Sequence, residues 1–235
     1  MNTDETLISV VIPVFNEELT IGNVIERLTA VMQKIGFKYE IIIVDDCSTD
    51  KSLEISKNQN AKVFSLKKHM GKGYALRAGF AKAKGDIITT IDSDGSHRPE
   101  ELPRLLAPIL RNKADLVIGS RYLSQKPVAT KKLNAAGVRL FNLLIKILTR
   151  AEVSDSQSGY RVMKSAVLRS MHLKSSEYEI ESEMLVKTAR QGFRVIEVPI
   201  SFEQRTYGTS RLDPVVDGFK ILLSIVSAYI KGGRG

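Results

Sequence analysis

Two aspartates separated by one small residue are the residues of this sequence best suited to chemistry. Asp92 and Asp94 flank Ser93 directly after the apolar run at residues 87–91. A strand that ends in this way places hard oxygen ligands at the carboxyl edge of a sheet, where open α/β folds bind their ligands. Mg²⁺ and Mn²⁺ prefer one or two carboxylates completed by phosphate oxygens. The pattern therefore indicates a metal held for a nucleotide diphosphate, and its alternative is a solvated turn.

Acidic residues also follow the first two predicted strands. The apolar runs at residues 8–12 and 40–44 lead into Glu17 and Asp45. The carboxyl ends of parallel strands share one edge of a sheet, so these side chains should lie near the two aspartates. Carboxylates there can accept hydrogen bonds from ribose hydroxyls or base N–H groups. We expect Asp45 to contact a ligand, whereas Asp50 is expected to cap a helix.

Two polar segments further along the chain could serve the same site. Asp155 could orient a substrate or accept a proton, or it could only form a salt bridge with Arg161. Arg205 and Arg211 belong to a basic loop after the last predicted strand. Guanidinium groups suit a pyrophosphate, and Gly208 would suit a lid that closes on it.

Three other features have both a functional and a structural interpretation. Residues 71–73, Gly-Lys-Gly, resemble a phosphate-binding loop but lack the full P-loop spacing, so a tight turn is as good an interpretation. His97 follows the two aspartates, and a structural role is favoured over a ligand role. Alternating glutamates enter a predicted helix, where acid compensates the positive helix end: Glu177, Glu179, Glu181 and Glu183.

The first 120 residues alternate strand and helix patterns. β-branched apolar runs typical of strands covered on both faces lie at residues 8–12, 40–44, 61–66, 86–91 and 114–118. A helical pattern at 21–35 ends at Gly36, and another helix begins near Pro99. Such alternation predicts an α/β fold with a mostly parallel, doubly wound sheet.

Beyond residue 119 the pattern changes. We expect an amphipathic helix at residues 133–149, a strand at 160–163, a helix at 181–191 and a strand at 195–202. Pro199 within the last run suggests an edge strand or a bulge.

Bulk properties narrow the class of protein. The 235 residues carry a net charge of +9, which favours polyanionic partners such as anionic membranes or phosphorylated molecules. No nucleic-acid-binding motif accompanies this charge, so nucleic acid is not an expected partner. The single cysteine, Cys47, suits a reducing compartment. We expect no signal peptide, because residues 1–5 lack its features, and no membrane span, because no apolar run is long enough.

Five motifs in order along the chain resemble glycosyltransferase family 2, whose fold is called GT-A. They are VIPVFNE at 11–17, VDDCSTD at 44–50, DSDGSHRPE at 92–100, GSRY at 119–122 and DSQSGYR at 155–161. The resemblance covers nearly the whole chain. It is strongest to the polyprenyl-phosphate glycosyltransferases, a group typified by dolichol-phosphate mannose synthase.

The resemblance implies roles for particular residues. Asp94 and Arg121 would be the catalytic residues, and Mg²⁺ or Mn²⁺ the cofactor. The acceptor phosphate would meet Arg121 and Lys131, and the metal would meet Asp92, Asp94 and Ser96. The nucleotide sugar would contact Pro13, Phe15, Glu17, Asp45, Asp92, Ser93, Asp94, Arg205 and Arg211.

Three departures from the pattern of the family involve four residues. Ser93 and Gly95 replace the usual alanine and leucine around Asp94, and Ser96 stands where some relatives have glutamine. Lys131 stands where some relatives have arginine, so it offers a point charge in place of the planar, two-pronged guanidinium group. These departures bear on the metal loop and on the acceptor site.

The resemblance predicts inverting, metal-dependent transfer of a hexose, with mannose favoured, from a nucleotide diphosphate sugar to dolichyl or polyprenyl monophosphate. Residues 1–120 would bind the nucleotide sugar and residues 121–235 the acceptor, as parts of one catalytic domain. The helix at 133–148 would rest on a membrane interface, or else pack on the sheet or a dimer partner. We expect a peripheral location at the cytoplasmic face of a membrane, and a separate membrane-anchoring subunit is a possible partner.

Other functions remain open at this stage. Transfer to a sugar hydroxyl in polysaccharide or glycoprotein glycan assembly would need a general base, for which Asp155 and Glu181 are candidates. A nucleotidyltransferase also combines an α/β fold with acidic metal ligands. A non-catalytic sugar-nucleotide-binding subunit would keep the fold without the reaction.

Overall fold

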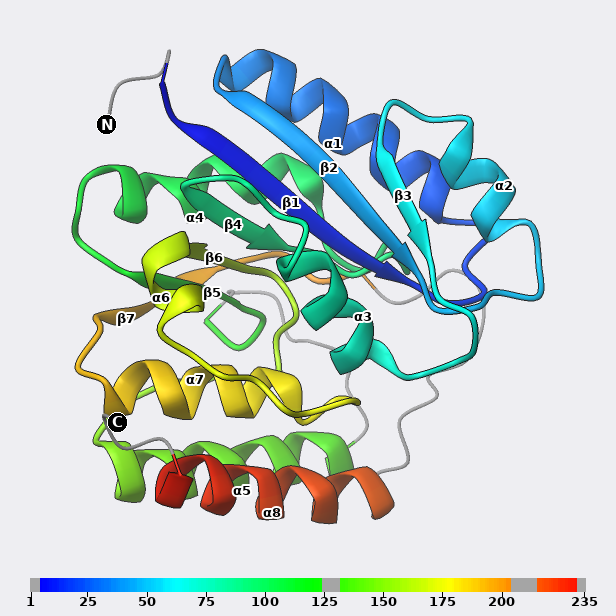
Figure 1. The fold of residues 1–235 in the computed structure, drawn as a ribbon. Helices are drawn as coiled ribbons and strands as arrows, with labels where there is room; N and C mark the ends of the chain where they lie inside the picture. Colours follow the sequence, from blue (N-terminus) through cyan, green and yellow to red (C-terminus); the bar gives the residue numbers. More distant parts are fainter. Residues whose placement is uncertain (1–4, 124–131, 204–214, 232–235) are drawn as a thin grey trace.

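The computed structural model describes residues 5–123, 132–203 and 215–231, with residues 132–135 by their backbone alone. Seven strands form one sheet in the order β3-β2-β1-β4-β6-β5-β7 (Figure 1). Only β6 runs antiparallel to its neighbours, β4 and β5. The strands are β1 (Leu7–Val14), β2 (Lys38–Asp45), β3 (Lys62–Ser65), β4 (Ile87–Thr90), β5 (Leu116–Ser120), β6 (Arg161–Lys164) and β7 (Val195–Pro199).

Helices cover both faces of this sheet, as the alternation in the sequence predicts. They are α1 (Ile21–Ile35), α2 (Ser52–Lys57), α3 (Lys72–Phe80), the 3₁₀ turn η1 (Pro99–Glu101), α4 (Leu102–Leu110), α5 (Lys132–Thr149), α6 (Ser165–Arg169), α7 (Ile180–Arg190) and α8 (Val216–Lys231). The α1 and α4 side chains pack on one face, and those of α3, α5, α7 and α8 on the other. In Figure 1, α5 and α8 lie farthest from the sheet, below α7.

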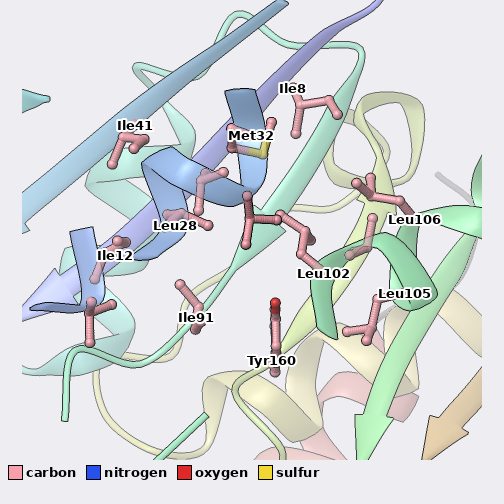
Figure 2. Packing of buried hydrophobic residues seen from close by; sticks show 14 of the residues in the cluster. Ile8, Ile12, Leu28, Met32, Ile41, Ile91, Leu102, Leu105, Leu106 and Tyr160 are labelled. Carbon is pink, nitrogen blue, oxygen red and sulfur yellow. The ribbon is translucent and has the colours of Figure 1, made fainter. Parts of the chain in front are cut away.

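Two apolar cores follow from the alternation of side chains along the strands. In β1, Ile8 and Ile12 face the first core, whereas Val11 faces the second. Figure 2 shows the first core, in which Met32 of α1, Ile8 of β1 and Leu106 of α4 belong to one cluster. The α1 helix ends at Gly36, whose φ of 75° is left-handed, as its place after the apolar pattern predicts.

The predicted strands and helices are confirmed, with shifts of a few residues at their ends. The run predicted at 195–202 forms β7 only as far as Pro199, and β7 is an edge strand. A proline is tolerated there because no ladder bond is lost: the following residue, Ile200, still donates its N–H to the Ser120 carbonyl of β5 at 3.0 Å. The N-cap position of α2 is Lys51 rather than the predicted Asp50, but Asp50 directly before it accepts the N–H of Ser52, the first residue of α2, at 2.9 Å.

Strands from both predicted halves of the chain build the single sheet. The first 120 residues supply β1 to β5, and the remainder supplies β6 and β7. The division into a donor half and an acceptor half stays a prediction. Within the described residues, no helix combines the length and the apolar character that crossing a bilayer requires.

Candidate functional site

A cavity of about 310 Å³ opens at the carboxyl ends of β1 and β4. Its walls come from the loops after β1, β2 and β4, from α3, and from the segments around the starts of α7 and α8. The lining residues are Pro13, Val14, Phe15, Glu17, Asp46, His69, Lys72, Ala75, Asp92, Ser93, Asp94, Glu177, Tyr178, Asp217 and Lys220. The structure thus gathers six residues predicted for the nucleotide sugar: Pro13, Phe15, Glu17, Asp92, Ser93 and Asp94. Their roles stay predictions.

Hydrogen bonds hold the loop after β4 in a defined shape. Asp94 Oδ1 accepts from the N–H and the hydroxyl of Ser96, at 2.9 and 2.6 Å. Thr20 Oγ1 donates to the carbonyl of Ser93 at 2.8 Å. Gly95 has a φ of 74°, a conformation in which glycine is not strained. The departure from the family pattern at Gly95 therefore suits this turn, and Ser96 lies beside Asp94 rather than on the cavity wall.

Lys72 joins two carboxylates inside the cavity. Its Nζ lies 2.7 Å from Asp92 Oδ1 and 2.7 Å from Glu181 Oε1. Burial opposes the charge of Lys72, but the two carboxylates outweigh burial and raise its pKa above the ordinary value. Gly71 at the start of α3, with a φ of 92°, donates its N–H to Asp46 Oδ2 at 2.8 Å. Sequence reasoning named the Gly-Lys-Gly segment but missed this ion pair.

Gly159 leaves room for the Asp92 carboxylate. A Cβ at position 159 would lie 2.6 Å from both carboxylate oxygens of Asp92, closer than real Cβ atoms approach such neighbours, so the carboxylate would have to shift. The Gly159 carbonyl also accepts from Thr90 Oγ1 at 2.7 Å, which ties this backbone to β4. The glycine of the DSQSGYR motif therefore leaves the space that the carboxylate of the first aspartate of the DSD motif occupies.

An aromatic pair forms another wall of the cavity. The Phe15 and His69 rings stack with centroids 3.9 Å apart and an interplanar angle of 18°. His69 Nδ1 lies 2.8 Å from Asp46 Oδ2, so a carboxylate orients the imidazole. Sequence reasoning singled out Phe15 but neither of the other two residues. The position of Asp46 directly after β2 was the signal that could have found it.

Asp45 lies behind the cavity rather than in its wall. It is completely buried, and it accepts from Ser65 Oγ at 2.8 Å and from the N–H of Ser48 at 3.3 Å. Its neighbour Asp46 lines the cavity instead. In this structure Asp45 shapes the loop after β2, and its predicted contact with the nucleoside stays untested.

Arg121 forms a two-pronged salt bridge with Asp155. Nε donates to Asp155 Oδ2 and Nη2 to Oδ1, both at 2.7 Å, and the backbone N–H of Arg121 donates to Oδ2 at 3.0 Å. Burial opposes the guanidinium charge, but Asp155 outweighs it and raises the pKa of Arg121. The guanidinium also lies 5.2 Å from the centre of the Phe202 ring, within cation–π range. Arg121 is therefore held in one orientation.

Arg161 does not form the salt bridge with Asp155 that was one interpretation of this motif, and Asp155 pairs with Arg121 instead. Arg161 is completely buried and donates to three backbone carbonyls, those of Ser156, Ser158 and Glu181, at 2.6 to 2.8 Å. Burial lowers the pKa of Arg161 to about 10. Arg161 instead joins the polypeptide before β6 to the first turn of α7, and so supports the backbone that carries Glu181.

His97 is a buried neighbour of the aspartates. Its Nδ1 lies 3.6 Å from Asp92 Oδ2, and its ring contacts those of Tyr160 and Phe202. Burial lowers the pKa of His97, which favours the neutral imidazole. Neither ring nitrogen has a hydrogen-bond partner within the described residues. The packing against two aromatic rings agrees with the structural role favoured for His97.

The alternating glutamates have different surroundings. Glu183 accepts from Lys187 Nζ at 2.6 Å and from the backbone N–H of Ser175 at 2.8 Å, a structural role as expected. Glu181 instead meets the cavity lysine. Three predicted site residues, Lys131, Arg205 and Arg211, lie outside the residues that the structure describes.

The donor set fits a divalent cation that a ligand completes. Asp92 and Asp94 offer carboxylate oxygens, which Mg²⁺ and Mn²⁺ prefer. Within the described ranges, no group of three or more acidic, histidine or cysteine side chains could hold an ion alone. Two carboxylates beside a cavity agree with a site whose remaining ligands are phosphate oxygens and water.

The chain matches known proteins over most of its length. Residues 9–171 match the model of Glycosyl transferase family 2. A UDP-N-acetylglucosamine–dolichyl-phosphate N-acetylglucosaminyltransferase of Methanococcus voltae is 32% identical, over 94% of this chain and 96% of that protein. A dolichol-phosphate mannosyltransferase of Pyrococcus furiosus is 32% identical over 87% of this chain, which spans 59% of that longer protein. An uncharacterised protein of Methanocaldococcus jannaschii is 35% identical over 98% of the chain and 94% of its own length.

Solved structures share the fold. A glucosyl-3-phosphoglycerate synthase of Mycobacterium tuberculosis, in complex with Mn²⁺, UDP and its product, gives a TM-score of 0.74 at 25% identity, covering 95% of this chain and 80% of that one. A mannosyl-3-phosphoglycerate synthase from Rubrobacter xylanophilus gives 0.74 at 21% identity, covering 96% and 73%. The mostly parallel sheet with helices on both faces is the GT-A fold of these enzymes. The chain belongs to glycosyl transferase family 2 and is a glycosyltransferase.

Proposed function

We propose that this glycosyltransferase transfers a hexose, with mannose favoured, from a nucleotide diphosphate sugar to dolichyl or polyprenyl monophosphate, with inversion at the anomeric carbon. The observation that carries the proposal is a pair of aspartates with a cationic neighbour. Asp92 and Asp94 line the cavity, and Lys72 Nζ lies 2.7 Å from Asp92 Oδ1. The two relatives that are named for dolichyl-phosphate acceptors support the choice of acceptor.

The cavity suits the nucleoside diphosphate part of the donor. The stacked Phe15 and His69 rings offer an aromatic edge for a base, and Glu17 can accept from ribose hydroxyls. GDP-mannose is the preferred donor and UDP-glucose the second choice. Asp92 and Asp94 would hold Mg²⁺ or Mn²⁺, which supplies Lewis-acid neutralisation of the leaving diphosphate. The solved relative with Mn²⁺ and UDP supports a divalent ion.

Lys72 and Glu181 fix the position of charge next to Asp92 in the cavity. The ammonium group of Lys72 holds the Asp92 carboxylate in place and keeps a positive charge in the cavity. Glu181 fixes the opposite side of that ammonium group and is almost completely buried. A positioned lysine beside the departing pyrophosphate lowers the energy of the negative charge that develops there.

Arg121 is the described residue best placed for the acceptor phosphate. A guanidinium has five N–H donors, and Asp155 takes only one each from Nε and Nη2. The remaining donors can bind a phosphate, and Lys131 is proposed as a second contact. An acceptor phosphate is already anionic at neutral pH, so attack on the sugar needs no strong general base.

The same geometry disfavours a sugar hydroxyl as acceptor. Such an acceptor needs a general base, and the two candidates were Asp155 and Glu181. Asp155 is completely buried and paired with Arg121, and Glu181 is paired with Lys72. A carboxylate already held by a cation is a weaker base, which favours the phosphate acceptor.

The α5 helix supports attachment to a membrane surface. Leu140, Leu143 and Ile147 recur at helical spacing and are exposed, although their neighbours Phe141 and Ile145 are buried. An exposed apolar face on a helix with basic residues is typical of interfacial attachment. The proposed location is the cytoplasmic face of a membrane, where a separate anchoring subunit could hold the enzyme.

The direct test is transfer to lipid. Purified protein is incubated with radiolabelled GDP-mannose, UDP-glucose or UDP-N-acetylglucosamine, polyprenyl phosphate and Mn²⁺, and the label extracted into organic solvent is counted. We expect lipid-linked label with one donor, and none without the divalent ion or the lipid. Label that stays in water-soluble glycan, or donor hydrolysis that ignores the lipid, would contradict the proposed acceptor.

A further inference from the structure

The C-terminal helix α8 carries two different stripes on its outer surface. One stripe is apolar, with exposed fractions between 42% and 68%: Phe219, Leu223, Val226 and Ile230. The other lies one residue further along and is polar: Lys220, Ser224, Ser227 and Lys231. Steps of four, three and four residues keep each stripe on one side of a helix. The α8 surface therefore presents an apolar row directly beside a row of lysine and serine.

The polar row forms one wall of a groove of about 540 Å³ between α8 and α7. The opposite wall comes from α7 and from the segment before it, and includes Lys174, Ser175 and Lys187. Four lysines line this groove against two glutamates, Glu179 and Glu183. Leu223 of the apolar row also lines it, so the groove opens where the two rows meet.

The two glutamates are already occupied by other groups. Glu183 accepts from Lys187 Nζ at 2.6 Å and from backbone N–H groups of the segment before α7 at 2.8 to 3.0 Å. Glu179 accepts from the N–H groups of Ser176 and Glu177 at 3.1 and 3.3 Å. Lys174 and Lys231 are exposed and, within the described residues, form no salt bridge. Lys187 pairs with Glu183, and Lys220 Nζ lies 3.3 Å from Asp217 Oδ1, so the excess of positive charge in the groove comes from Lys174 and Lys231.

We infer that this groove binds the phosphate of an anionic membrane lipid while the apolar row of α8 rests among the acyl chains. Lysine ammonium and serine hydroxyl groups are donors that suit phosphate oxygens. An apolar row next to a basic one is the pattern of a helix that lies in a membrane interface. The net charge of +9 adds attraction to an anionic leaflet.

The site is separate from the one proposed for the acceptor phosphate. Arg121 lies next to Asp155 and Phe202 and does not line the groove. Lys220 lines both the groove and the cavity, so a lipid held in the groove would place the cavity at the membrane surface. The inference rests on the proposed function in one respect: an enzyme with a lipid acceptor needs its cavity at the membrane surface.

The test is binding of the full chain to vesicles, measured by sedimentation. Vesicles contain phosphatidylcholine alone or with about one-third phosphatidylglycerol. The groove variant is Lys174→Gln/Lys231→Gln, which spares Lys220 because Lys220 also lines the cavity. The control is Lys34→Gln/Lys57→Gln, with the same loss of charge on the exposed ends of α1 and α2, on the opposite side of the molecule from α8 (Figure 1).

We expect the groove variant to bind anionic vesicles about 30-fold more weakly, because each lysine near such a surface contributes roughly 1 kcal/mol. The control variant should keep most of its affinity, and neutral vesicles should bind both weakly. Equal losses in the two variants would overturn the inference in favour of diffuse charge attraction. Competition by free glycerol phosphate at concentrations that leave ionic strength unchanged would overturn the lipid assignment and indicate a soluble phosphate.

Turnover distinguishes this inference from the proposed function. In detergent with a short-chain polyprenyl phosphate, the groove variant should transfer sugar as fast as the unmodified protein. If the groove variant binds vesicles more weakly as expected but no lipid-linked sugar forms with any donor, the lipid-binding role of the groove is supported and the proposed acceptor is wrong. If transfer occurs but the groove variant binds vesicles as well as the unmodified protein, the proposed function is supported and the lipid-binding role of the groove is wrong.

Discussion

The two ends of the central sheet both carry aspartates beside basic side chains, but they use them differently. At the amino end of β5, Asp115 is enclosed by Arg194, at 3.0 and 3.1 Å, and by Lys164 at 2.7 Å. At the carboxyl end of β4, Asp92 meets one lysine and Asp94 is held by Ser96, and both face a cavity. The charge of Asp115 is compensated by its basic neighbours, whereas Asp92 and Asp94 line a cavity that a ligand can enter.

This contrast distinguishes a charge cluster that holds chain segments together from aspartates whose charge is available to a ligand. Asp115 ties three chain segments together, because Arg194 precedes β7 and Lys164 ends β6. Its hydrogen bonds with Arg194 and Lys164 outweigh the effect of burial and hold the pKa of Asp115 well below its ordinary range. At the carboxyl end of β4, Asp94 is held by the N–H and the hydroxyl of Ser96, which leave its charge for a cation, and Asp92 pairs with Lys72 at the cavity. The predictions below test this difference, beginning with the largest expected effect on turnover.

Asp94→Asn should reduce metal-dependent turnover by about 1,000-fold or more, because an amide removes the charge that a divalent ion needs. The amide oxygen can still accept from Ser96, so the loop and the melting temperature should change little. Steady-state transfer rates and a thermal unfolding curve check both statements. Retained turnover at ordinary Mn²⁺ concentrations would remove Asp94 from the site.

Arg121→Lys should lower kcat/KM for the lipid phosphate by about 100-fold, because lysine offers a point charge in place of the planar fork. Lysine is chosen over alanine since a completely buried Asp155 would otherwise lose its cation. Donor affinity, measured by titration calorimetry, should stay unchanged. Arg77→Lys on α3, whose guanidinium contacts Tyr74 and the Lys174 carbonyl, is the matched control. A loss of donor affinity alone would contradict the acceptor role.

Gly159→Ala should raise the Mn²⁺ concentration needed for half-maximal rate about tenfold. The new Cβ would displace the Asp92 carboxylate, which it would approach to 2.6 Å. The matched control is Gly137→Ala on α5, where the nearest atom to a new Cβ is 3.9 Å away on Phe141. An unchanged Mn²⁺ dependence for Gly159→Ala would mean that Asp92 contributes little to ion binding.

Asp115→Asn should leave turnover unchanged and lower the free energy of unfolding by about 2 kcal/mol at pH 7, since it loses charged hydrogen bonds. The control Glu152→Gln, in an exposed pair with Lys146, should not change stability measurably. Because folding depresses the pKa of Asp115, its contribution is complete above the unfolded value of about 4. It is lost as the pH falls from there through the folded pKa. Chemical denaturation at pH 7 and pH 3 should therefore show the difference between wild type and Asp115→Asn shrinking.

The sequence predicted the parts of the site that depend on strand ends. Runs of apolar residues located β1, β2 and β4, and the residues just after them, Glu17 and Asp92 among them, had to lie at one edge. Sequence reasoning did not find Lys72 as an ion-pair partner, nor His69. Their contacts depend on how α3 packs against the sheet and on which segment lies opposite, and spacing along the chain carries no such information.

Contacts between segments that are distant in the sequence explain the other differences between the predicted and the observed site. The segments around α7 and α8 bring Glu181 and Lys220 to the cavity from more than 80 residues beyond β4. A salt bridge of Arg161 with Asp155 was one interpretation of the sequence, but the guanidinium donates to backbone carbonyls of three residues instead. A buried arginine bonded to carbonyls has no sequence signature, because any residue can supply a carbonyl.

The central claim is that the aspartates after β4 hold a divalent ion at the donor diphosphate. The most direct measurement is anomalous diffraction at the manganese edge from crystals containing Mn²⁺ and the nucleotide sugar that stabilises the protein most. We predict one strong peak in contact with the carboxylates of Asp92 and Asp94 and with the diphosphate, and no such peak in Asp94→Asn crystals. A donor bound in the cavity with the manganese peak elsewhere, in a protein that still transfers sugar, would contradict the account.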